Sequence, residues 1–328
     1  MKAIVCTKYG PPEVLQLKEV TKPGPNDDQT LVQVHAASVT FSNLLLVTGG
    51  PFPIRLIAGW FRKPKVQILG SDIAGRIEAV GRNVERFQPG DEVFGYLADC
   101  GKGGYAEYVC APEKALGLKP ANLSFEEAAA VPEAALVALQ AVRDDGQIQK
   151  GQKVLIYGAS GGIGTFAVQI AKSFGAEVTG VCSTRNVDLV RAIGADHVID
   201  YTQEDCARGD GQYDLIFQLA GTHSPSALRR ALTPKGTLVL SSGMGRIGGL
   251  DRIVKVLVSA LFVSQSMRTW VADENKKDLV VLKELLESGK VTPVIDRSYG
   301  LSEAPEAIRY VEEGHTQGKV IISLSSPA

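Results

Sequence analysis

A glycine-rich turn between an apolar run and a helical segment is the feature that most constrains how this chain folds. The apolar run occupies residues 154–157, the turn covers 158–164, and residues 165–172 continue as a helix. Glycine lets the backbone approach a pyrophosphate closely, while the helix N-terminus offers unpaired N–H groups and a partial positive charge. Both flanks fit, so we predict a dinucleotide site, although a ligand-free strand–helix turn would share this local pattern. The residues predicted to hold the pyrophosphate are Ala159, Ser160, Gly161, Gly162, Ile163 and Gly164.

Length, charge and cysteine usage exclude several classes of protein. With 328 residues the chain is long enough for two domains. A net charge of -1 and the lack of a long basic run argue against nucleic acid as a partner. The five cysteines and four histidines are scattered without metal-ligand spacing, and the first residues fit a short strand rather than a targeting signal. We therefore expect a reduced, cytoplasmic protein.

The pattern of elements changes once along the chain. Residues 1–122 read as short strands with frequent glycine and proline, which predicts a partly open β-barrel. After a helix start at Ser124, strands and helices alternate, which predicts a doubly wound parallel sheet. We expect one domain from 1–122 and 273–328 and another from 123–272. The expected strands are 2–6, 30–34, 73–80, 92–96, 105–110, 153–157, 177–182, 197–199, 213–217, 236–241 and 319–324, and the expected helices are 162–174, 187–193, 225–232, 273–288 and 302–313.

The residues after the second strand of the sheet favour NADP(H) over NAD. An NAD site usually places a carboxylate there to bind the ribose 2′-hydroxyl, and none is present at the end of residues 177–182. Arg185 offers a charged fork suited to a phosphate, and Ser183, Thr184 and Asn186 offer neutral hydrogen bonds. Alternatively, Ser183 and Asn186 cap the next helix and Arg185 is a solvated surface charge. Backbone contacts to the dinucleotide are also expected at the carboxyl ends of two later strands, from Leu219, Ala220, Ser241, Ser242 and Gly243.

Over essentially its whole length, the chain resembles the medium-chain dehydrogenase/reductase superfamily, and most closely its zinc-free quinone oxidoreductase branch. The resemblance implies a GroES-like domain built from both chain ends around a Rossmann domain. It also implies a homodimer and hydride transfer from NADPH to a quinone or an α,β-unsaturated carbonyl. In this family Tyr201 and Lys319 match positions near the cofactor phosphates. The segments that carry the resemblance are 69–75, 80–81, 90–93, 103–107, the glycine-rich turn, 194–201 and Gly236.

Metal-dependent relatives hold a catalytic zinc ion with Cys, His and Cys, and the matching positions here are Thr40, Ser71 and Glu133. Two hydroxyls and one carboxylate would not hold zinc, so we expect no metal. Without a Lewis acid the sensible hydride acceptors are already electrophilic, namely quinones, enones and enals.

Three residues are candidates for the chemistry. Thr40 and Asn43 would donate hydrogen bonds to the substrate oxygen, where negative charge develops; alternatively, they cap a short helix. Glu133 lies in an apolar stretch and needs a partner or a proton, so it could relay protons. Asp72, a second carboxylate near the position of the family's zinc ion, is expected mainly to accept backbone hydrogen bonds.

Two apolar and basic segments, 51–63 and 250–262, suggest a hydrophobic substrate. We expect them to form a helix and loop in the active-site wall, while a membrane contact or a dimer contact is less favoured. Two rival functions are an enoyl-thioester reductase, which the loss of a family tyrosine at Leu45 disfavours, and an NADPH-binding or sensing protein with little turnover.

Overall fold

The computed structural model describes residues 1–50, 64, 67–98, 103–207, 211–221, 223–241, 265–270 and 276–324. The chain divides into two compact units, which we call the first and second unit. The first contains Met1–Glu133, Glu274–Glu287 and Pro293–Ala328, and the second contains Ala134–Asp273 and Ser288–Thr292. Both ends of the chain therefore belong to the same unit. No helix in the described part of the chain is both long and apolar enough to cross a bilayer.

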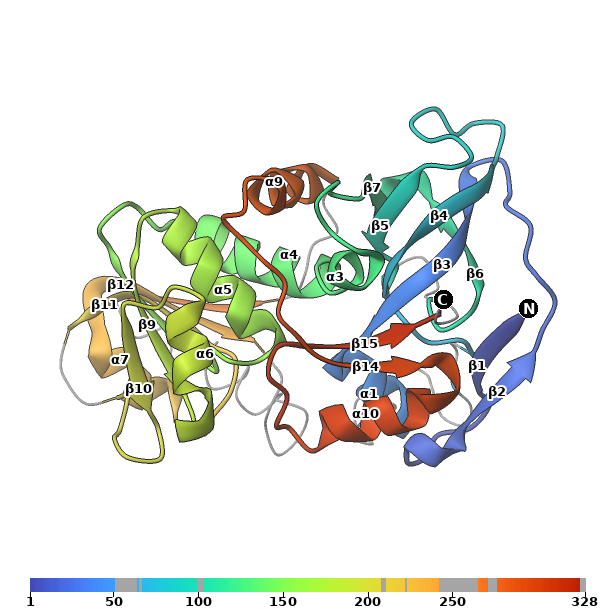
Figure 1. Ribbon diagram of the computed structural model, residues 1–328. Helices are drawn as coiled ribbons and strands as arrows, with labels where there is room; N and C mark the ends of the chain where they lie inside the picture. The colour runs from blue at the N-terminus through green and yellow to red at the C-terminus, as the bar shows by residue number, and fades with distance from the viewer. Residues whose placement is uncertain are drawn as a thin grey trace. The chain divides into compact units, whose positions relative to one another are not determined.

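The first unit is built on a mixed sheet with strand order β14-β15-β3-β4-β5-β7, with β6 also paired to β3 and a separate hairpin-like pair β1-β2. All pairings are antiparallel except β14 with β15 (Figure 1). Its strands are β1 (Lys2–Cys6), β2 (Leu15–Glu19), β3 (Gln29–Val39), β4 (Asp72–Val80), β5 (Glu92–Tyr96), β6 (Tyr108–Pro112), β7 (Leu116–Leu118), β14 (Ile295–Gly300) and β15 (Lys319–Ser323). Its helices are α1 (Phe41–Thr48), α3 (Phe125–Ala129), α9 (Lys276–Glu287) and α10 (Ala304–Glu312), and α4 (Pro132–Gln140) begins at its boundary.

Strand β3 organises this sheet because it is long enough to pair with three other strands. One edge pairs with β4 along most of its length. The other edge pairs with β6 over residues 29–33 and with β15 over residues 36–39. Bulges interrupt the β3–β4 register between Leu31 and Val32 and between Val34 and Ala36, and such bulges bend a strand and increase its twist. With eleven residues, β3 has room for both β6 and β15 on one edge.

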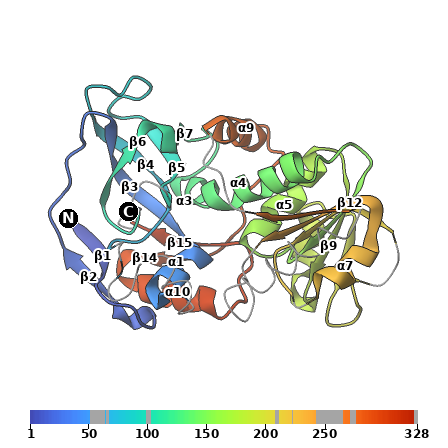
Figure 2. The same cartoon turned by 180° about the vertical axis from the view of Figure 1, so that it is seen from behind.

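The core of the first unit lies between the sheet and the packed helices α1 and α10, which contact one another (Figure 2). Helix α10 buries Ala304, Ala307 and Ile308, a spacing of three and four residues that places all three on one face. Helix α1 buries Leu44 and Val47 in the same way. Burial of these apolar faces, rather than helix propensity, stabilises such short helices.

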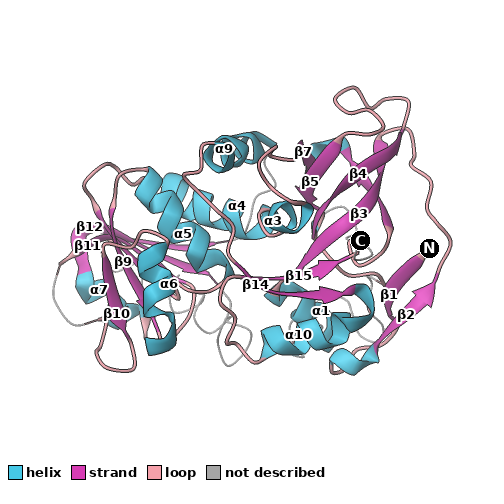
Figure 3. Ribbon diagram, viewed as in Figure 1, coloured by secondary structure: helices cyan, strands magenta, loops and turns pink. Residues whose placement is uncertain are grey.

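The second unit is a parallel six-stranded sheet with the order β10-β9-β8-β11-β12-β13. The chain adds β9 and β10 on one side of β8 and then returns to add β11 to β13 on the other side. Figure 3 shows β9, β10, β11 and β12 of this sheet with helices α5, α6 and α7. The strand order therefore reverses between β8 and β11, and ligands of such sheets bind at the carboxyl ends of the strands at this point. Its strands are β8 (Lys153–Tyr157), β9 (Glu177–Cys182), β10 (His197–Asp200), β11 (Tyr213–Gln218), β12 (Leu232–Ser241) and β13 (Ser266–Trp270), and its helices are α5 (Gly162–Ser173), α6 (Val187–Ala192) and α7 (Pro225–Ala231).

The predicted strands and helices of the second unit agree with the structure to within one or two residues, except that β12 begins four residues earlier than predicted. The strands β2, β7, β13 and β14 were not predicted, because none of them has a strong local pattern. The domain boundary predicted after residue 122 differs from the observed one after Glu133, since α3 packs on β3 and β4 of the first unit. We also predicted that residues 273–328 all belong to the first domain. Ser288–Thr292 belongs to the second unit instead.

Gly75 provides a test of how closely β3 and β4 approach one another. A Cβ atom at Gly75 would lie 2.1 Å from the carbonyl oxygen of Gln33, whereas a Cβ at Gly24 would meet nothing within 4 Å. We expect Gly75→Ala to destabilise the protein by at least about 1–3 kcal/mol, and Gly24→Ala to have little effect. Urea denaturation followed by circular dichroism measures both variants, and equal stabilities for the two would contradict the close approach.

Candidate cofactor site and active-site residues

The glycine-rich turn is held tightly against the neighbouring strand. The N–H groups of Gly158 and Ala159 both donate to the carbonyl oxygen of Val181 in β9, at 3.0 Å. Gly158 has φ of 97°, a left-handed conformation that favours glycine. A Cβ at Gly164 would lie 2.0 Å from the carbonyl oxygen of Gly158. The first helical turn of α5 therefore packs directly against the backbone of the glycine-rich turn.

The N-terminus of α5 is suited to an anion. Its N-cap residue, Gly161, has no side chain to cap the helix, and the first turn contains no acidic residue. A Cβ at Gly161 would meet only the carbonyl oxygen of Gly158, at 3.6 Å, so this side of the turn is open. The unpaired N–H groups of a first helical turn and the helix dipole attract phosphate. These residues fit the pyrophosphate of a dinucleotide.

Asn186 is tied to the turn rather than directed to solvent. Its Nδ2 donates to Ser160 Oγ at 2.8 Å, and both side chains are buried. This bond links the residues after β9 to the middle of the glycine-rich turn. By contrast, Thr184 and Arg185 are exposed and Ser183 is half-buried. Of the four residues predicted beside the adenosine ribose, Arg185 is the exposed cation.

Asp200 is a residue at this edge that the sequence reasoning missed. It ends β10, and the parallel register places it beside Cys182 at the end of β9. Its carboxylate accepts from Thr184 Oγ1 at 2.6 Å and from the N–H and Oγ1 of Thr202. These bonds, that of Thr184 most of all, lower the pKa of Asp200. Its neighbour Tyr201 is 54% exposed, so its ring is accessible to a ligand. The sequence could have identified Asp200, because residues that end adjacent parallel strands share one edge of the sheet.

The ends of β8 and β11 are joined at the point where the strand order reverses. The N–H groups of Leu219 and Ala220 donate to the carbonyl oxygen of Tyr157, at 2.9 and 3.2 Å. Leu219 and Ala220 therefore lie at the edge where we predicted them. Ser241 ends β12 at the same edge of the sheet. Ser242 and Gly243 lie outside the described residues, as do the two apolar segments 51–63 and 250–262.

In the first unit, a buried carboxylate joins three distant segments. Asp72 is completely buried and accepts from Ser38 Oγ at 2.7 Å and from the N–H of Glu133 at 3.0 Å. The ammonium group of Lys319 lies 3.5 Å from the same carboxylate, and its side chain is also buried. Burial raises the pKa of Asp72, while Lys319, Ser38 and Glu133 counteract that rise. Asp72 thus has the structural role that we expected, and the approach of Lys319 to a cofactor phosphate stays a prediction.

Thr40 and Asn43 form the start of α1. Thr40 is its N-cap residue, and its N–H donates to Asn43 Oδ1 at 3.0 Å. Tyr105 donates its hydroxyl hydrogen to the same Oδ1 at 2.9 Å, a contact that the sequence reasoning missed because this tyrosine resembled an ordinary strand residue. Burial, with the nearby charges of Asp72 and Glu133, raises the pKa of Tyr105 well above its usual value, so the hydroxyl stays protonated. Asn43 therefore helps to cap the start of α1, and contact of Thr40 or Asn43 with a substrate stays a prediction.

The donors to Asn43 Oδ1 also fix the orientation of its amide group. Since the oxygen faces the N–H of Thr40 and the hydroxyl of Tyr105, the nitrogen must point elsewhere. That Nδ2 and the Oγ of Ser71 are buried atoms with no hydrogen-bond partner among the described residues. Buried polar groups in folded proteins are almost always hydrogen-bonded. Two donors are therefore available in this region for a ligand.

The residues at the positions of the family's zinc ligands do not suit a metal ion. The hydroxyl of Thr40 is already bonded to Ser42 Oγ at 2.6 Å, and Ser71 offers a second hydroxyl. Neutral hydroxyls are not among the ligands that zinc selects, and Glu133 alone would supply one carboxylate. The donor chemistry of Thr40, Ser71 and Glu133 therefore does not fit a catalytic zinc site.

Known proteins resemble the chain over nearly its whole length. Residues 26–140 match the family described as alcohol dehydrogenase GroES-like domain, and residues 193–322 match the family described as zinc-binding dehydrogenase. The mitochondrial NAD(P)H oxidoreductase RTN4IP1 of Mus musculus is 34% identical, with 99% of this chain and 89% of that protein covered. The chloroplastic NADPH-dependent alkenal/one oxidoreductase of Arabidopsis thaliana is 31% identical, with 98% and 79% covered. The structure of the quinone oxidoreductase from Coxiella burnetii is 30% identical and superposes with a TM-score of 0.87 over 99% of both chains.

The chain belongs to the zinc-free quinone oxidoreductase branch of the medium-chain dehydrogenase/reductase superfamily. It is an oxidoreductase that uses a nicotinamide cofactor. The predicted combination of a GroES-like domain, here the first unit, and a Rossmann domain, here the second unit, is confirmed. The glycine-rich turn of this oxidoreductase lies where the dinucleotide binds in a Rossmann sheet.

The buried pair of Asp72 and Lys319 provides a second test. Lys319→Met leaves a buried carboxylate without its cation, so we expect a loss of about 3–5 kcal/mol of stability. Adding Asp72→Asn removes the charge as well, and we expect the double variant to be more stable than Lys319→Met alone. Urea denaturation of the wild type, both single variants and the double variant completes the cycle. Additive effects would show that the two side chains do not interact.

Proposed function

We propose that this oxidoreductase uses NADPH to reduce quinones or α,β-unsaturated carbonyl compounds. The observation that carries the proposal is the open, uncapped N-terminus of α5 with an exposed arginine, Arg185, at the end of the neighbouring strand. The names of the relatives support it, since they include a quinone oxidoreductase and an NADPH-dependent alkenal/one oxidoreductase. A homodimer in the cytoplasm remains part of the proposal.

The preference for NADPH over NADH follows from the charges at the end of β9. Arg185 would pair with the 2′-phosphate, for which its planar guanidinium is well suited. No carboxylate ends β9, although Asp200 lies on the adjacent strand. The Asp200 carboxylate already accepts three hydrogen bonds from Thr184 and Thr202. We therefore propose that Asp200 orders this loop and does not bind the ribose 2′-hydroxyl.

The acceptor must be electrophilic because the donor set around Ser71 does not fit a Lewis-acidic metal ion. NADPH supplies the hydride. We propose that Asn43 Nδ2 and Ser71 Oγ donate hydrogen bonds to an oxygen of the bound substrate or cofactor, since both are buried atoms without a described partner. Donors fixed in advance stabilise negative charge that develops on oxygen. Thr40 and Tyr105 then act as positioning residues by fixing the Asn43 amide group.

Arg185 provides the test of cofactor preference. We expect Arg185→Ala to raise KM for NADPH by about 10–100-fold, because a hydrogen bond to a charged group contributes about 1.5–3 kcal/mol. KM for NADH should stay unchanged, since NADH lacks the 2′-phosphate. Arg191→Ala is the matched control, because Arg191 is another exposed arginine of the second unit and pairs with Asp188. Equal losses for NADPH and NADH would show that Arg185 does not read the phosphate.

A panel of acceptors tests the reaction itself. NADPH oxidation is followed by absorbance with benzoquinone, phenanthrenequinone, a 2-alkenal, a vinyl ketone, an enoyl thioester and a simple aldehyde, each with and without a chelator. We expect turnover of quinones or enones that resists the chelator. Turnover of only the simple aldehyde, abolished by chelator, would contradict the proposal. Turnover of only the thioester would indicate an enoyl-thioester reductase, and tight NADPH binding without turnover would indicate a binding protein.

A further inference from the structure

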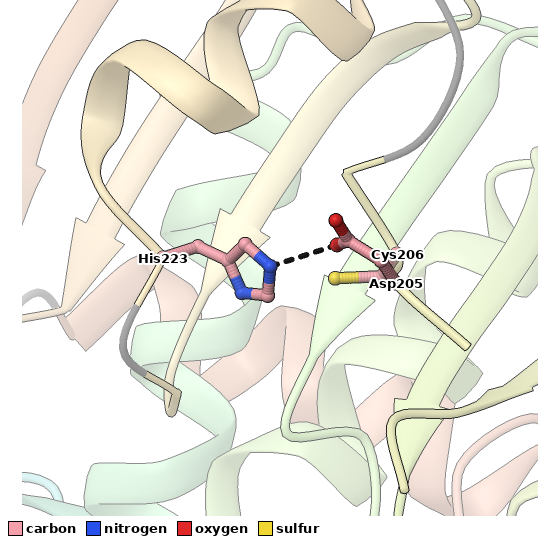
Figure 4. A group of neighbouring side chains, drawn as sticks. All are labelled: Asp205, Cys206 and His223. Carbon is pink, nitrogen blue, oxygen red and sulfur yellow. Dashed lines mark hydrogen bonds and ion pairs between the residues drawn. The ribbon is translucent and has the colours of Figure 1, made fainter. Parts of the chain in front are cut away.

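Three side chains with metal-binding atoms meet on the second unit, whereas the positions of the family's zinc ligands belong to the first unit. Asp205 and Cys206 lie in the loop after β10, and His223 lies in the loop after β11 (Figure 4). One ligand atom from each residue, a carboxylate oxygen, a sulfur and a ring nitrogen, lies within 4.8 Å of the other two. Among the described residues, this is the one group of three or more His, Cys, Asp or Glu side chains arranged in this way.

The geometry combines a buried sulfur with two partly exposed ligands. Cys206 is 2% exposed, whereas the side chains of His223 and Asp205 are 26% and 47% exposed. Nε2 of His223 lies 2.8 Å from Asp205 Oδ1, and the sulfur of Cys206 faces the same side of the ring (Figure 4). Zinc binds such atoms at about 2.0–2.3 Å, so small rotations of the three side chains would place all three ligand atoms at binding distance from one ion. The exposed side chains leave a path from solvent.

Neighbouring residues hold the three side chains in place. The hydroxyl of Tyr157, at the end of β8, lies 3.1 Å from Nδ1 of His223. Because a hydroxyl can donate or accept, it can serve the ring when Nε2 carries a hydrogen and when Nε2 binds a metal. Histidine ligands usually have such a partner on the second nitrogen. In addition, Gln218 Nε2 donates to the carbonyl oxygen of His223, and the N–H of Ala207 donates to Asp205 Oδ1.

The approach of His223 to Tyr157 depends on a glycine. Gly221 has φ of 84°, and a Cβ at this residue would lie 2.2 Å from Tyr157 Cζ. The loop after β11 therefore passes directly over the tyrosine ring before it reaches His223. A side chain at position 221 would separate the ring from the loop. The arrangement is thus specified by the backbone as well as by the ligands.

A cysteine–histidine catalytic pair is a poorer interpretation of the same residues. In a catalytic pair one ring nitrogen meets the nucleophile and the carboxylate holds the other, whereas here Asp205 holds Nε2 and the hydroxyl of Tyr157 holds Nδ1. A carboxylate oxygen, a sulfur and an imidazole nitrogen within 4.8 Å of one another are better suited to share an ion.

We propose that Asp205, Cys206 and His223 bind a divalent transition-metal ion, with zinc as the ion that best matches a mixed sulfur, nitrogen and oxygen donor set. Binding would release the thiol proton to solvent and leave a fourth position for water. The ion would join the loops that follow β10 and β11, which leave the same edge of the sheet as the dinucleotide-binding turn. The proposal does not depend on the proposed function, because the ion is not assigned a role in hydride transfer.

The test uses cobalt(II) as a spectroscopic probe of the reduced, metal-stripped full-length protein. A bound thiolate gives a near-ultraviolet charge-transfer band, so we expect one equivalent of cobalt to develop this band. Zinc should abolish the band by competition and raise Tm. Cys206→Ser should remove the band, and His223→Gln should weaken binding strongly while it keeps the sulfur. Tyr157→Phe should weaken binding by about 10–100-fold, as loss of a partner to a metal-bound histidine does.

Matched controls separate this site from other thiols and histidines of the second unit. Cys182 is also buried, with a pKa raised to about 11, and His197 pairs with Glu177. Cys182→Ser and His197→Gln should therefore bind cobalt as the wild type does. Circular dichroism confirms that each variant is folded. No band in the wild type, or a band that persists in folded Cys206→Ser, would overturn the proposal.

Discussion

The first unit depends on a buried carboxylate whose partners come from distant parts of the chain. Asp72 begins β4, and it binds Ser38 of β3, the N–H of Glu133 at the start of α4, and Lys319 of β15. A buried charge is tolerated only when other groups satisfy it. Because one of those groups lies nearly 250 residues further along the chain, this requirement ties the C-terminal strand to the N-terminal sheet. The bond from the N–H of Glu133 also fixes the start of α4 at Asp72, which follows Ser71, one of the two proposed donors to the substrate.

The dinucleotide-binding turn of the second unit depends on close backbone contacts. The turn after β8 can bind a pyrophosphate because Gly158 and Gly164 allow α5 to touch the turn, and because Gly161 leaves the helix uncapped. Asn186 and Asp200 add a second layer, since they bind Ser160 and Thr184 from neighbouring strands. The two arrangements divide the work of an oxidoreductase. In the proposed reaction, the Rossmann unit holds the cofactor pyrophosphate at α5, and the GroES-like unit supplies Asn43 Nδ2 and Ser71 Oγ as donors to an oxygen atom.

The predictions succeeded where a strong local pattern has one outcome and failed where a contact between distant residues decides. Strands β8 and β9 and helix α5 were predicted almost to the residue, because apolar runs and glycines mark their ends. The short strands β7 and β14 were missed, since their identity comes from pairing with neighbours. Tyr105 was taken for an ordinary strand residue, yet it orients Asn43. Asn186 bonds to Ser160, a contact that no pattern within β9 could reveal, and its contact with the cofactor stays a prediction.

The sequence by itself determined the family, the order of strands and helices, the dinucleotide-binding turn and the unsuitability of Thr40, Ser71 and Glu133 for zinc. Each of these follows from residue type and local spacing, which act over a few residues. The tertiary structure alone decided which polar groups meet. It brought Asp200 beside Thr184, placed Lys319 on Asp72, and assembled Asp205, Cys206 and His223 around one position. Such groupings depend on sheet register and on the paths of loops, because residues that lie close in space at a sheet edge are separated in the chain by whole strands and helices.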